Sequence, residues 1–406
     1  MKKGKGVLQE GMTGLYLACL SIYIIAFTFI CEGELHQYFK FFTWQDYLIL
    51  LKVLHILLIV KILYDVFQDV RMLPVVAAAG AVGYLVFRHN PEDFFLSALW
   101  FLCAGRGVKP KATVRTLFWS HLFSLAVLAA LCVSGVLSFG AMVKQGHTAV
   151  SYSLGLAHPN MLAVKTLQLV LLFWLMTEGR MKKLWYVFLA GVTAAVQLFT
   201  ECRTVVVLMI LLLICSVLLE NGRLWSFLSR KRRLLGRIHI GVYLGMAGGS
   251  ILFFWLNRGK DFGYGNTIFS RITEAIKYFR HYGITLWGSP VITHNTAPEQ
   301  AEAAGLYTLD NGYMYLLLGF GAVMFVCFLF LQAGTLRWLY ERRKFCWIVA
   351  YSEFFLMGFV ETQVIRTSMN FTLFFLFGFI WEWLERKREW KNECGKTGKK
   401  FWKGCI

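Results

Sequence analysis

The chain has 406 residues, of which 57% are hydrophobic, 17% aromatic and 16% charged, and its formal net charge is +19. Soluble domains hold about 25% charged residues, so this composition excludes an ordinary soluble domain. Continuous apolar runs of about 20 residues recur along the chain, as membrane-spanning helices require, whereas a β-barrel would show shorter alternating segments. We therefore predict an all-α polytopic membrane protein.

Hydropathy predicts about twelve transmembrane helices in a single membrane domain over residues 1–406. The fourth is short, and we see no internal repeat, which disfavours many transporter folds. The predicted spans are 12–31, 47–65, 72–87, 93–104, 116–138, 160–177, 184–200, 204–219, 238–256, 311–335, 345–361 and 367–384.

The distribution of basic residues predicts the orientation. With both termini in the cytoplasm, the inner segments hold about three times as many lysines and arginines as the outer ones, as the positive-inside rule expects. The inner segment 220–237 includes the basic cluster 230–233, and the basic tail 385–406 is predicted to lie on anionic lipid headgroups or to act as a topology anchor. The rule explains the net charge, so no nucleic-acid partner is predicted.

The orientation places the loop 257–310, between spans nine and ten, on the outer face. This is the only long polar segment between two spans. ATP and nucleotide sugars are absent outside the cell, so an enzyme built there needs an activated substrate, and lipid-linked donors are the obvious class. The chain has no Walker motif, no H-E-x-x-H and no C-x-x-C spacing among its ten cysteines, so no metal or other cofactor is predicted.

Three cations lie near the predicted outer surface. Lys52 and Lys165 are each about five residues, or roughly 8 Å, below the outer end of a span. Arg203 lies in the outer turn between spans seven and eight. Together they could form a pocket for a lipid diphosphate. The alternative for the two lysines is snorkelling to the interface.

The outer loop contains two further candidates. Apolar residues at helical spacing over 268–279 predict an amphipathic helix with Arg271 and Lys277 on its polar side. These two residues could be functional groups, or they could simply form a solvated charged face. Asp310 directly precedes span ten, where it is predicted to be the helix N-cap and to stay ionised. It could also orient an acceptor hydroxyl or take its proton late in the reaction.

Other polar groups have both structural and functional interpretations. His158 precedes Pro159 and Asn160, which open span six. This sequence could be only a turn and helix cap, or His158 could be a proton-transfer group. His55 and Glu353 lie near the middle of spans two and eleven, where a hydrogen bond between them would reduce the cost of burial. A proton path in a transporter is the alternative use of these two residues.

Several short motifs, in this order, resemble those of bacterial O-antigen and capsule polymerases of the Wzy type, which are related to the O-antigen ligases. They are Leu-Gly-Leu-Ala-His-Pro-Asn at 154–160, Cys-Arg-Thr at 202–204, Arg271 followed by Trp287-Gly288, and Leu-Asp-Asn-Gly-Tyr at 309–313 with Gly-Phe-Gly at 319–321. The resemblance covers roughly residues 90–385. It implies an architecture similar to the GT-C glycosyltransferases, in the bacterial cytoplasmic membrane.

The resemblance also implies roles for individual residues. Arg203 and Arg271 resemble external-loop arginines that hold the donor diphosphate. Asp310 and Asn311 occupy the position where the ligases carry His-Asn, and an Asp there favours a polymerase. The predicted catalytic residues are thus Arg203, Arg271 and Asp310, and the predicted substrate-binding residues are His158, Asn160, Lys165, Lys52, Asn311 and Tyr313.

The implied reaction transfers a glycan from undecaprenyl diphosphate to a lipid-linked repeat unit. The implied partners are this lipid-linked oligosaccharide, membrane lipids, a flippase and a chain-length regulator. One alternative is a ligase that moves the glycan to another acceptor. Another is a transporter or flippase of lipid-linked sugars, for which His55, Glu353 and Gln332 are the main support.

Overall fold

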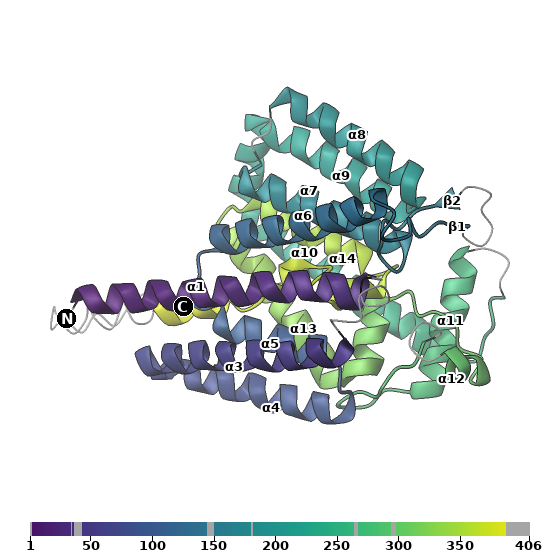
Figure 1. The fold of residues 1–406 in the computed structure, drawn as a ribbon, viewed down its shortest axis with the longest axis horizontal. Coiled ribbons are helices and arrows are strands. Elements are labelled where there is room, and N and C mark those ends of the chain that lie inside the picture. Colours follow the sequence, from purple (N-terminus) through teal and green to yellow (C-terminus); the bar gives the residue numbers. More distant parts are fainter. Residues whose placement is uncertain are drawn as a thin grey trace.

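The computed structural model describes residues 2–33, 35, 43–143, 150–179, 182–263, 267–293 and 298–386. Figure 1 shows a bundle in which most helices run along one direction. A π-helical turn at Thr28–Glu32 extends the first helix, and short 3₁₀ turns lie at Val70–Met72, Thr362–Ile365 and Phe371–Phe375. The α-helices are α1 (Lys2–Phe27), α3 (Trp44–Gln68), α4 (Leu73–His89), α5 (Asp93–Ala104), α6 (Pro110–Val133), α7 (Pro159–Met176), α8 (Lys183–Thr200), α9 (Arg203–Glu220), α10 (Gly222–Leu256), α11 (Thr267–Tyr282), α12 (Pro298–Ala303), α13 (Gly312–Glu341) and α14 (Phe345–Met357); the strands are β1 (Met142–Val143) and β2 (Val150–Ser151).

The helices confirm an all-α polytopic membrane protein. In the described part of the chain, nine helices are long and apolar enough to cross a membrane, and α5 and α14 are shorter apolar helices. The first eleven predicted spans all overlap these helices, although the spans 116–138 and 345–361 extend past the ends of α6 and α14. The predicted basic tail 385–406 lies almost wholly outside the described residues.

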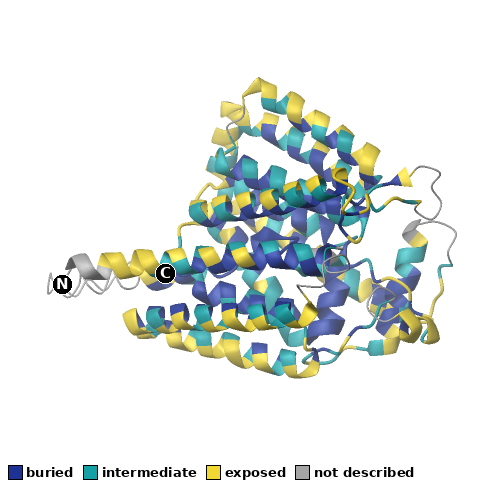
Figure 2. Ribbon diagram, in the orientation of Figure 1, coloured by how far each residue is buried: buried dark blue, intermediate teal, exposed yellow. Residues whose placement is uncertain are grey.

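The flank of the bundle is apolar, as a lipid-facing surface must be. Large side chains such as Ile56, Leu184 and Val207 are 60%, 77% and 62% exposed. Figure 2 shows many exposed residues on the outward sides of α3, α4, α8 and α9. Exposed apolar area costs about 25 cal/mol per Å² in water, a penalty that lipid tails remove.

Contacts between distant turns define two ends of the bundle. At one end, Arg106 pairs with Asp69 (Nη2–Oδ2 2.7 Å), and this contact joins the turn after α5 to the turn after α3. At the other end, Asn90 donates to the Gly319 carbonyl (2.8 Å). This second end carries β1, β2, α11 and α12, and Figure 1 shows it opposite the start of α1. We call it the loop end.

One predicted inner loop, 220–237, is helical instead. Asn221 caps α10 by accepting hydrogen bonds from the amides of Arg223 and Leu224. The Leu, Arg and Lys residues of segment 220–237 are strong helix formers. At 1.5 Å per residue, the 35 residues of α10 extend about 50 Å, so its basic first half reaches beyond a hydrocarbon core of about 30 Å.

The last predicted span, 367–384, is also wrong as a continuous helix. Residues 367–377 form turns and a 3₁₀ segment, and helix resumes only at 378–386. Non-helical backbone is tolerated at membrane depth when protein groups satisfy its carbonyls. Tyr351 donates to the Thr372 carbonyl (2.9 Å), and Lys165 and Gln168 donate to the Ser368 carbonyl (3.4 and 3.1 Å).

Helix α13 is broken at Gly321, and the loop after α11 fills the break. Gly321 has φ 85° and ψ 169°, a conformation that essentially requires glycine. The Ser289 amide donates to the Leu318 carbonyl (3.0 Å), and the Ala322 amide donates to the Thr285 carbonyl (2.9 Å). Loop backbone thus replaces hydrogen bonds that the helix loses, which explains why a glycine-rich turn and a Gly-Phe-Gly sequence occur together.

We expect Gly321→Val to destabilise the protein by on the order of 3 kcal/mol, through backbone strain and overpacking. A Cβ at residue 321 would collide with the carbonyl oxygen of Leu286. Gly80→Val is the control, because a Cβ at Gly80 meets nothing within 4 Å. Thermal unfolding in detergent measures both; equal melting temperatures would contradict this role for Gly321.

Candidate functional site

An ion pair at the loop end joins two of the predicted catalytic residues. Arg271 on α11 lies with its Nε 3.2 Å from Oδ2 of Asp310, which precedes α13. The two side chains are 31% and 32% exposed, so solvent and ligands reach the pair. In the described part of the chain the two Nη groups of Arg271 have no hydrogen-bond partner, whereas its Nε faces Asp310.

Asp310 is an accessible carboxylate rather than a cap. The predicted N-cap role belongs to Asn311, whose side-chain oxygen accepts the Met314 amide (2.8 Å). Burial raises the pKa of Asp310, and the positive charge of Arg271 lowers it. The arginine therefore helps to keep a partly buried carboxylate ionised.

Helix α11 confirms the predicted amphipathic segment. It buries Ala275, Ile276 and Phe279 against the bundle. On its polar side, Lys277 pairs with Glu274 (3.2 Å) and donates to the Gly305 carbonyl (3.3 Å). Lys277 therefore anchors the loop before α13, whereas Arg271 faces Asp310.

Asn311 and Tyr313 fasten the start of α13 to the end of α14. Asn311 Nδ2 donates to the Phe359 carbonyl (3.4 Å), and the Tyr313 hydroxyl donates to the Phe355 carbonyl (3.1 Å). Tyr313 is 5% exposed. These contacts hold Asp310 in place. Substrate binding by Asn311 and Tyr313 stays a prediction.

His158 and Asn160 lie at the start of α7, as predicted for a turn and cap. His158 is the N-cap, with Nδ1 accepting the Asn160 amide (3.1 Å). Asn160 Nδ2 donates to Oε1 of Glu361, which is 5% exposed (3.3 Å). This bond joins α7 to the segment after α14 at the loop end.

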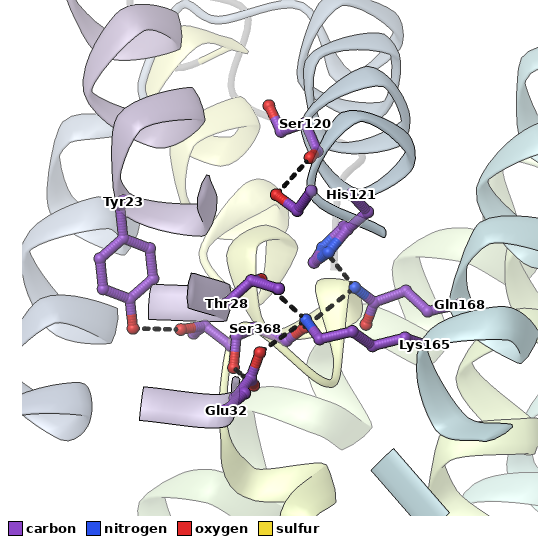
Figure 3. A network of polar contacts seen from close by, with 10 residues as sticks. Tyr23, Thr28, Glu32, Ser120, His121, Lys165, Gln168 and Ser368 are labelled. Carbon is purple, nitrogen blue, oxygen red and sulfur yellow. Dashed lines mark hydrogen bonds and ion pairs between the residues drawn. The ribbon is translucent and has the colours of Figure 1, made fainter. Parts of the chain in front are cut away.

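Lys165 is buried in the bundle rather than at its surface. Its ammonium lies 2.7 Å from Oε2 of Glu32, and both side chains have no exposed area. It also donates to Oγ1 of Thr28 (3.0 Å). Figure 3 shows Lys165 reaching Glu32 and Thr28 within one polar network. Snorkelling is therefore the wrong description of Lys165, because Glu32 compensates its charge inside the protein.

Lys52 and Arg203 are exposed, unlike Lys165. Lys52 interacts electrostatically with Asp93 at the start of α5. Arg203 is the first residue of α9, after Glu201 in a left-handed conformation (φ 47°). Lys165 therefore contributes no unpaired charge to the predicted three-cation pocket, because it is buried and paired with Glu32.

The predicted contact between His55 and Glu353 is wrong. His55 Nε2 lies 2.9 Å from Oγ of Ser97, since α3 packs on α5 while Glu353 belongs to α14. Glu353 is fully buried, and in the described residues neither of its carboxyl oxygens has a hydrogen-bond partner.

Sequence reasoning missed the residues that surround Lys165. Within the buried network, Ser368 Oγ donates to Oε1 of Glu32 (2.5 Å), and Gln168 Nε2 lies 2.5 Å from Nε2 of His121. All four side chains are fully buried. The sequence did contain a signal for this network: Glu32 and His121 lie inside or next to apolar runs, where ionisable groups are costly and commonly functional.

Comparison with known proteins adds no relative. The chain matches no known protein-family model, no curated protein and no solved structure.

Proposed function

We propose that this protein is a polysaccharide polymerase that joins undecaprenyl-diphosphate-linked repeat units at the loop end, which faces outward from the bacterial cytoplasmic membrane. The Arg271–Asp310 ion pair carries this proposal. It consists of a guanidinium, a group suited to bind an anion, beside a carboxylate at the loop end.

The two groups suit the two halves of a glycan transfer. The acceptor hydroxyl attacks the anomeric carbon of the donor, a new C–O bond forms, and undecaprenyl diphosphate leaves with the bonding electrons. Arg271 would stabilise the charge that develops on the diphosphate, and Arg203 would assist from the start of α9. Asp310 would orient the acceptor hydroxyl and accept its proton.

The outer loop supports this chemistry by its attachment to α13. Residues 285–289 hydrogen-bond across the break at Gly321, so the loop is fixed to α13 at this point. A fixed loop over the site would limit the access of water, which competes with the acceptor as nucleophile. A ligase would use the same geometry with a different acceptor.

A transporter is the second candidate, and buried Glu353 is the observation that favours it. Alanine substitutions separate the two functions. The polymerase requires loss of polymer formation in Arg203→Ala and Arg271→Ala, with activity retained in His55→Ala and Glu353→Ala. The opposite pattern would support transport.

The acid side of the pH–activity profile should depend on Arg271. Its charge lowers the pKa of Asp310, so Arg271→Gln should raise that pKa. Because the carboxylate works in its ionised form, activity should then disappear at a higher pH than in the wild type. Single-turnover assays with excess enzyme would measure the residual activity; an unchanged acid limb would exclude Asp310 as the titrating group.

A further inference from the structure

The non-helical segment that follows α14 is held from several sides. Thr367 hydrogen-bonds to the Tyr23 hydroxyl (3.0 Å), and Ser368 bonds to Glu32 through its hydroxyl and to Lys165 through its carbonyl. Figure 3 shows Ser368 beside the buried Glu32–Lys165 ion pair. Arg366 directly precedes this anchored stretch, so its backbone has little freedom to move.

Arg366 is a partly buried cation without a carboxylate partner. Its guanidinium lies over the ring of Phe94, 5.7 Å from the ring centre, at the first turn of α5. Within the described residues the Arg366 guanidinium forms no ion pair and no hydrogen bond. Two acids at this end of the bundle are engaged elsewhere, since Glu92 accepts from the Tyr315 hydroxyl (3.2 Å) and Glu32 is paired with Lys165. A half-buried guanidinium with unused donors is a site for an anion.

Packed aromatic rings connect Arg366 to the start of α13. Phe94, which lies under the Arg366 guanidinium, packs edge-on against Phe320 (ring centres 5.7 Å apart), and Phe320 packs against Tyr315 (6.0 Å). Tyr315 lies in the first turn of α13, which begins two residues after Asp310. Arg366 therefore belongs to the same end of the bundle as the candidate site.

We propose that Arg366 is a further phosphate-binding residue of this site, held in position by the buried Glu32–Lys165 network. The proposal rests on the proposed polymerase function, in which the ligand is a polyprenyl diphosphate. Arg366 would bind the diphosphate from the side of α5, and Arg271 would bind it from α11. Charge-assisted hydrogen bonds from two sides would orient the leaving group.

The test measures binding of undecaprenyl diphosphate to the full-length protein in detergent, without turnover. Arg366→Gln should weaken binding about tenfold to a hundredfold, as expected for loss of charge-assisted hydrogen bonds. Arg366→Lys should weaken it less, because charge remains but the planar fork is lost. Arg258→Gln is the matched control, since this exposed outer arginine lies over Trp255 (4.9 Å). Equal melting temperatures of the variants establish that all are folded.

The outcomes separate this proposal from the function on which it rests. Wild-type binding that Arg366→Gln and Arg258→Gln reduce equally would overturn the role of Arg366 and leave the polymerase intact. Absence of wild-type binding would overturn both. Equal displacement by phosphatidylglycerol would show a general lipid-headgroup site, which contradicts a substrate role. If Arg366→Gln does not fold, Arg366→Lys decides, and unchanged affinity in that variant contradicts a bidentate phosphate contact.

Discussion

Replacing Lys165 by methionine should destabilise the protein by about 3–5 kcal/mol, because Glu32 would be left as a buried charge without a partner. The two side chains have no exposed area and lie 2.7 Å apart. Glu32→Gln should have a similar effect through the unpaired ammonium. Thermal unfolding in detergent, followed by the fluorescence of the 14 tryptophans, would measure the loss.

The double variant Glu32→Gln/Lys165→Met distinguishes an ion pair from simple loss of packing. Removing both charges should restore most of the stability, since replacement of a whole buried pair is often nearly neutral. Lys111→Met is the control, because its pair with Glu178 is 77% and 53% exposed and should matter little. A double variant as unstable as the sum of the single variants would contradict this account.

Replacing Arg271 by alanine should lower the rate of glycan transfer by about 10²–10³-fold, the usual effect of removing one group that stabilises developing charge. The same change leaves Asp310 without its cationic neighbour, which raises the pKa of that carboxyl. Both effects act on the chemical step, so the rate at saturating substrate should fall.

Two variants control the Arg271 experiment. Arg271→Lys should retain more activity than Arg271→Ala, because it keeps the charge without the planar fork. Arg258→Ala removes an exposed arginine of the same loop, 257–310, and should remain close to wild type. If Arg258→Ala and Arg271→Ala lose activity equally, the effect is a general loss of positive charge and Arg271 has no special role.

Hydropathy was sufficient to predict most of the helices, because a bilayer requires long apolar runs with internally satisfied backbones. The same rule failed at residues 367–377, which are equally apolar but non-helical. There the backbone bonds go to side chains of distant helices, among them Lys165 and Tyr351. A single sequence contains no local signal for such partners.

The candidate site was likewise only partly predictable from the sequence. Arg271 and Asp310 were selected from motif resemblance, and their contact depends on the packing of α11 against α13. The proximity of Glu32 to Lys165 depends on how α1 and α7 are brought together, which spacing within one helix cannot predict. Asp310 and Asn311 are both good capping residues, so local sequence did not decide which of them caps α13.

The most direct test of the central proposal uses purified wild-type protein and a lipid-linked repeat unit, with no nucleotide sugar present. The polymerase predicts a ladder of longer glycans on a gel, with one undecaprenyl diphosphate released for each bond formed. Folded protein that leaves an intact donor unextended under these conditions would contradict the proposal.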